Sequence, residues 1–180
     1  AMDHMKRSYE QIVACAETYD IPVTIEVHGY FTTNPDRVEQ MVEFVNFINN
    51  DTQEVWAKQF SASGQTYQPA KLVLFRDSTS SRCGYGAAAM GPFNCPGDQK
   101  AYIDLSFYEE LKRRFGAPGD FAQAYVLAHE IGHHVQHQLG IEQSVRQAQE
   151  SNPRQANELS VRMELQADCF AGVWGHSAGQ

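Results

Sequence analysis

LAHEIGHHVQHQLG, which spans Leu127–Gly140, holds four histidines and one glutamate. Within it, His129, Glu130 and His133 form the pattern H-E-x-x-H. An α-helix has about 3.6 residues per turn, so side chains four positions apart lie on one face, one turn apart. His129 and His133 can therefore reach one zinc ion, and Glu130 projects near the same face as a candidate general base.

The other two histidines of this stretch do not fit the same ion. His134 is rotated by about 100° from His133, and His137 lies two turns, about 12 Å, from His129. A longer zinc pattern, H-E-x-x-H-x-x-G-x-x-H, supplies its own third ligand, but here glutamine and leucine replace its glycine and last histidine. We interpret His134 and His137 as surface histidines or as outer partners of the site.

The third ligand has to come from elsewhere in the chain. The segment ELQAD holds Glu164 and Asp168, which lie four residues apart and so share one helix face. We predict that Glu164 binds the zinc ion and that Asp168 accepts a hydrogen bond from the outer ring nitrogen of His129, which fixes the ring's tautomer. Two histidines, one glutamate and a water make a four-coordinate zinc site of the catalytic type.

The helix that carries H-E-x-x-H is predicted to cross the core. Its apolar residues recur every four positions, at Leu127, Ile131, Val135 and Leu139. Gly132 costs about 1 kcal/mol relative to alanine inside a helix, which is tolerable if another backbone approaches closely. Burying the charged Glu130 and Glu164 in such a core would be costly without a metal ion.

Apolar spacing, caps and turn residues predict an α+β fold, with a small sheet packed against several helices. The H-E-x-x-H helix is expected at the centre, with the Glu164 helix packed against it. We predict a helix and then a strand over residues 6–33, helices over 35–64, 106–116, 120–140 and 153–174, and strands over 71–75 and 100–105.

The chain of 180 residues carries a formal net charge of −8, which argues against nucleic acid as a partner. No apolar run reaches the roughly 18 residues needed to cross a bilayer. Cys83 and Cys95 flank the loop CGYGAAAMGPFNC. A disulfide there would contribute about 3 kcal/mol and indicate an oxidising compartment. Two reduced thiols in a turn are the alternative.

Three longer stretches, RRFGAPGDFAQAYVLAHEIGHHVQ, GPFNCPGDQKAYIDLSF and LSVRMELQADCFAGVW, resemble the bacterial putative neutral zinc metallopeptidase family over roughly residues 51–174. The resemblance implies a zincin fold of the glutamate-ligand type, a gluzincin, with site chemistry similar to that of thermolysin. It assigns one zinc ion to His129, His133 and Glu164, the role of catalytic base to Glu130, and that of an orienting group to Asp168.

The same resemblance implies a protein of the cell envelope, anchored in the membrane by a segment outside this chain, with the domain extracytoplasmic. We expect residues 1–5 to be a vector-derived scar and residues 6–45 to be an N-terminal segment of unassigned role. Residues 46–180 would be the zinc metallopeptidase domain. Because family members continue past this point, we expect the domain to be truncated at its C-terminus.

We predict a zinc metallopeptidase, an endopeptidase acting on peptides or proteins through zinc-activated water and Glu130 as general base. The strand over residues 100–105 is expected to pair with an extended substrate as an edge strand. Candidates for stabilising the oxyanion are Tyr102, Tyr125 and His176. Two alternatives stay open: a non-catalytic envelope interaction protein with a structural zinc, and a zinc amidase acting on cell-wall peptides. The glutamate base favours catalysis, because a structural site does not need one.

Overall fold

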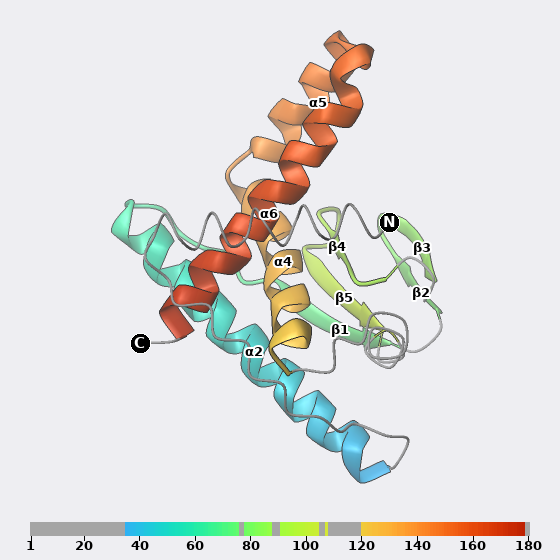
Figure 1. The fold of residues 1–180 in the computed structure, drawn as a ribbon, viewed down its shortest axis with the longest axis vertical. Helices are drawn as coiled ribbons and strands as arrows, with labels where there is room; N and C mark the ends of the chain where they lie inside the picture. Colours follow the sequence, from blue (N-terminus) through green and yellow to red (C-terminus); the bar gives the residue numbers. More distant parts are fainter. Residues whose placement is uncertain (1–34, 76–77, 88–90, 105–106, 108–119, 179–180) are drawn as a thin grey trace.

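The computed structural model of the chain describes residues 35–75, 78–87, 91–104, 107 and 120–178. These residues form four α-helices and a three-stranded sheet, which lies beside α4 (Figure 1). The helices are α2 (Pro35–Ala62), α4 (Asp120–Gln138), α5 (Ile141–Ser151) and α6 (Ala156–Ala178), with the short 3-10 helix η2 (Pro153–Gln155) between the last two. The sheet has the order β1 (Lys71–Phe75), β5 (Lys100–Asp104), β4 (Phe93–Cys95). This arrangement confirms the predicted α+β class.

Strand β5 lies in the middle of the sheet, which corrects the prediction that this segment is an edge strand. β1 pairs with it in parallel and β4 pairs with it antiparallel, and both contact Ala101, through Leu72 and Asn94. Residues 101–104 are all buried: Ala101 and Ile103 pack into the main core, and Tyr102 packs into a smaller cluster with Phe75 and Cys95. The edge of the sheet nearest the H-E-x-x-H helix is therefore β4, which we did not predict as a strand.

Helix α4 runs through the core, as predicted. Leu127, Ile131 and Val135 are buried in one cluster with residues of α2, β5 and α6. The helix stops before Gly140, whose φ of 72° favours glycine. Leu139 lies beyond the end of α4 and is exposed, so its predicted place in the core was wrong.

Helices α4 and α6 approach each other closely at Gly132. A Cβ atom added at Gly132 would lie 2.9 Å from the carbonyl oxygen of Ala167 and 3.2 Å from its Cα atom. The expected close approach of another backbone is therefore confirmed, and that backbone belongs to the helix that carries Glu164.

Helix α2 is continuous through Asn49 and Asn50, and the C-terminal part of α6 crosses it in Figure 1. The indole nitrogen of Trp174 donates a hydrogen bond of 2.7 Å to Asp51, which ties the end of α6 to α2. This helix also runs through residue 45, where the predicted N-terminal segment of unassigned role (residues 6–45) ends. The division of the chain into segments stays a prediction.

Strands β2 (Ser78–Ser81) and β3 (Gly84–Ala87) form a separate antiparallel hairpin. A disulfide between Cys83 and Cys95 joins the tip of this hairpin to the end of β4, as predicted. The elements expected over residues 6–33 and 106–116 lie outside the described residues, apart from residue 107. Among the described helices, none is long and apolar enough to cross a membrane.

Candidate metal centre

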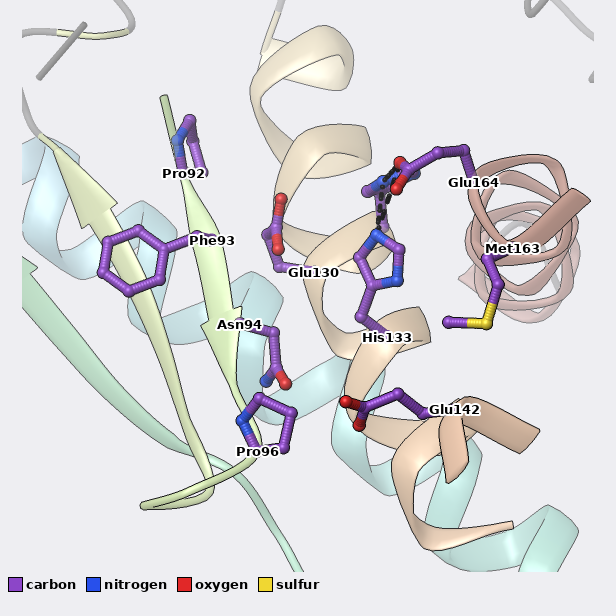
Figure 2. Close-up of a pocket in the computed structure, with 10 residues that line it drawn as sticks. Pro92, Phe93, Asn94, Pro96, Glu130, His133, Glu142, Met163 and Glu164 are labelled. Atoms are coloured by element: carbon purple, nitrogen blue, oxygen red, sulfur yellow. Dashed lines mark hydrogen bonds and ion pairs between the residues drawn. The ribbon is translucent and has the colours of Figure 1, made fainter. Parts of the chain in front are cut away.

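Two helices bring His129, His133 and Glu164 to a common point (Figure 2). Both histidines lie on α4 and the glutamate lies on α6. The Nε2 atoms of His129 and His133 are 3.1 Å apart, and they lie 3.3 and 3.4 Å from Oε2 of Glu164. The three predicted ligand atoms thus converge.

These distances fit a zinc ion. Ligand atoms that sit about 2.0–2.1 Å from a tetrahedral zinc ion are separated from one another by about 3.3–3.4 Å. The three measured separations lie close to that value. Two imidazoles and one carboxylate are also the ligand set of catalytic zinc sites, which keep a fourth position open. The residues present therefore match zinc in both chemistry and spacing.

Glu130 lies beside this point but turns toward β4 rather than toward the other carboxylate (Figure 2). Its side chain is buried, and the backbone N–H of Asn94 donates a hydrogen bond to it. Burial raises the pKa of Glu130, although the charges of His129 and His133 oppose the rise. A carboxyl group with a raised pKa, placed between the metal point and a strand edge, is suited to accepting and returning a proton.

A pocket opens over the metal point between β4 and the helices (Figure 2). The β4 segment forms one wall, α4 forms the floor, and α6 forms the opposite wall. Glu142, at the start of α5, lies near Pro96 at one end, where His137 and Arg146 hold its carboxylate at 2.9 and 2.6 Å. The described lining residues are Pro92, Phe93, Asn94, Pro96, His129, Glu130, His133, Glu142, Met163 and Glu164.

The outer ring nitrogens of the two histidines have different partners. Nδ1 of His129 lies 2.8 Å from Oδ1 of Asp168, and the same oxygen accepts a hydrogen bond from the hydroxyl of Tyr125. Nδ1 of His133 lies 2.8 Å from Oε1 of Gln136. One ring therefore faces a carboxylate and the other faces a neutral amide.

The pKa shifts of the ligands follow from these contacts. Burial lowers the pKa of His129, but hydrogen bonds to Asp168 and Glu164 outweigh this effect and raise the pKa to about 10. Hydrogen bonds from His129 and His133 hold the pKa of Glu164 well below its usual range. Glu164 therefore stays ionised at neutral pH and remains available as an anionic ligand.

The structure does not bring the three candidate oxyanion groups together. Tyr102 is 2% exposed, its ring is stacked against that of Phe93, and its hydroxyl donates a 2.7 Å hydrogen bond to Asp98. Tyr125 donates to Asp168, and His176 lies twelve residues beyond Glu164 on α6, about 18 Å along the axis. None of the three is among the described residues that line the pocket.

Sequence reasoning missed two residues of this site, Gln136 and Asn94, and misplaced His134, which follows the ligand His133. Gln136 lies three residues after His133 on the same helix face, a spacing that could have identified it. Asn94 gave no signal, because β4 has only three residues between two prolines. His134 is fully buried rather than near the surface, and its Nε2 atom bonds to the backbone oxygen of Gln68 at 2.7 Å.

Comparisons with known proteins match most of the chain. A family model described as putative neutral zinc metallopeptidase covers residues 22–180. The uncharacterized protein YpfJ of Escherichia coli (strain K12) is 55% identical over 143 residues, which is 79% of this chain and 50% of the relative. The uncharacterized protein Rv2575 of Mycobacterium tuberculosis (strain H37Rv) is 42% identical over 113 residues, 62% of this chain and 37% of the relative. The chain thus spans about half the length, or less, of these relatives. No solved structure matches it.

Proposed function

Because the chain belongs to the family of putative neutral zinc metallopeptidases, we propose that it is a zinc-dependent endopeptidase. The observation that carries the proposal is the spacing of His129, His133 and Glu164, whose ligand atoms lie 3.1–3.4 Å apart. Glu130 lies beside them and faces a strand edge across an open pocket. A purely structural zinc site would need neither the pocket nor the additional buried carboxylate.

His129, His133 and Glu164 would hold the ion. When bound, zinc supplies a Lewis acid that polarises a peptide carbonyl and makes water more acidic. Glu130 takes the proton from the attacking water and returns it to the departing amine. Because its pKa is raised, Glu130 can hold the proton closer to neutral pH than an exposed glutamate can, before it passes the proton to the amine. Asp168 holds the ring of His129 by its outer nitrogen, so that the inner nitrogen keeps its lone pair for the ion.

Strand β4 supplies the surface on which a peptide would lie. It is at the edge of the sheet, and its residues Phe93 and Asn94 line the pocket. The backbone of Asn94 is hydrogen-bonded to Glu130, so this edge lies beside the catalytic group. An extended peptide added as a further strand would therefore lie between β4 and the metal point.

We also propose that the domain works outside the cytoplasm. The Cys83–Cys95 disulfide supports this location, because such bonds persist in oxidising compartments and are rare in the cytosol. The chain spans about half the length of the E. coli relative that it matches. Alkylation of thiols in intact cells followed by mass spectrometry tests the location. Finding Cys83 and Cys95 fully reduced in the cells would contradict a location outside the cytoplasm.

The test of the function is hydrolysis of an unfolded protein by the zinc-loaded chain, beside Glu130→Gln prepared in the same way. We expect the wild type to cleave, and the variant to keep its zinc while losing activity by at least about 100-fold. Activity retained in the variant would overturn the role of Glu130. Zinc binding without hydrolysis of any peptide by the wild type would favour a structural zinc.

A further inference from the structure

Gln136 is a fully buried polar residue between the two helices that carry the metal ligands. Its Oε1 atom lies 2.8 Å from Nδ1 of His133. Its Nε2 atom donates to the backbone oxygen of Met163 at 2.8 Å and to Oε1 of Gln166 at 3.1 Å, both on α6. One amide group thus connects a predicted ligand on α4 to the backbone of α6.

The orientation of this amide follows from its partners. The backbone oxygen of Met163 can only accept a hydrogen bond, so the NH₂ group of Gln136 has to face α6. Its oxygen then has to face His133, and that oxygen can only accept. Nδ1 of His133 therefore carries the proton, and Nε2 is the nitrogen whose lone pair is available to a metal ion.

The same amide also bears on Glu164. Met163, which accepts its hydrogen bond, directly precedes Glu164 in α6. The side chain of Glu164 is 54% exposed, so packing does little to place its carboxylate. Its position depends instead on where the backbone of α6 is held. Several contacts hold α6 against α4, among them those of Gly132 with Ala167 and of His129 with Asp168. Gln136 provides the contact to the residue directly before the glutamate.

We propose that Gln136 is a positioning residue that sets the tautomer of His133 and places Glu164, and so joins the two helices into one preformed zinc site. Its role differs from that of Asp168, which faces His129 with a negative charge. Gln136 brings no charge, and its two ends connect His133 with the backbone of α6 beside Glu164. The proposal rests on the zinc site of the proposed function but not on hydrolysis.

The test compares Gln136→Met with Gln53→Met. Methionine keeps much of the volume of glutamine and removes its hydrogen bonds. Gln53 is a matched control on α2: its Nε2 atom donates to the backbone oxygen of Ala70 at 3.0 Å, its Oε1 atom accepts from Tyr67, and it is also buried. Zinc affinity is measured by competition with a chelator. The ring N–H signals of histidine are followed by NMR in the zinc-loaded proteins.

We expect Gln136→Met to weaken zinc binding about 10- to 100-fold and to lose the exchange-protected Nδ1 proton signal of His133. Gln53→Met should lower the melting temperature while keeping the wild-type zinc affinity and the signal. Equal zinc affinity in Gln136→Met and the wild type would overturn the proposal. The proposal would also be overturned if the wild type itself showed no protected Nδ1 proton signal for His133. A wild type that binds no zinc would instead overturn the proposed function.

Discussion

His129 Nδ1 and Asp168 Oδ1 lie 2.8 Å apart across the interface of α4 and α6, and the hydroxyl of Tyr125 donates to the same oxygen. This contact fixes the ring of His129 so that Nε2 meets His133 and Glu164 at the common point. The charge of Asp168 also makes the imidazole a stronger electron donor to a metal ion.

Replacing Asp168 with Asn should therefore weaken zinc binding by about 10- to 100-fold, because it removes the negative charge behind His129. Tyr125→Phe removes one hydrogen bond to Asp168 and leaves that charge, so its loss of affinity should be smaller. Chelator competition measures both. Unchanged affinity in Asp168→Asn would show that this carboxylate does not support the site.

Gly132→Ala should destabilise the fold by about 1–3 kcal/mol, even though alanine is the better helix former. The added Cβ would meet the backbone of Ala167 at 2.9 Å and push α6 away from α4. Gly172→Ala on α6 is the control, because nothing lies within 4 Å of a Cβ atom there. The control should be neutral or should gain up to about 1 kcal/mol. Urea unfolding measures both, and a stabilising effect of Gly132→Ala would contradict the close approach.

Removing the disulfide should lower the free energy of unfolding by about 3 kcal/mol, since the bond closes a short loop in the unfolded chain. We expect the reduced wild type to unfold at a lower temperature than the oxidised wild type. The double variant Cys83→Ser/Cys95→Ser should unfold at a temperature similar to that of the reduced wild type. Cys169→Ser keeps the disulfide and should still respond to reductant. A melting temperature of the wild type that does not change with reductant would contradict this contribution.

The sequence predicted the site correctly where all the residues that define a feature lie on one helix. His129, Glu130 and His133 share one turn of α4, and the apolar spacing of Leu127, Ile131 and Val135 identified that helix and its burial. Glu164 and Asp168 could likewise be paired because both lie on one face of α6. Gly132 pointed correctly to a close backbone contact, since a helix interior rarely favours glycine without one.

The sequence failed where the outcome depended on pairing between distant segments. β5 is central because both β1 and β4 pair with it, and its own five residues do not contain that information. Tyr102 donates to Asp98 and stacks on Phe93, which lines the pocket, and only the pairing of β4 with β5 brings these two rings together. Helix α5 went unpredicted because its 11 residues carry only a short apolar stripe, formed by Ile141, Val145 and Ala148, and none of its residues is buried.

Zinc content is the most direct test of the claim that two helices together build one metal site. The wild type, loaded with zinc and dialysed, is compared by elemental analysis with His133→Ala and Glu164→Ala. We predict one zinc ion per wild-type chain and loss of most of it from both variants, because each removes one of three ligands. A wild type that holds no zinc, or variants that keep one ion per chain, would contradict the account.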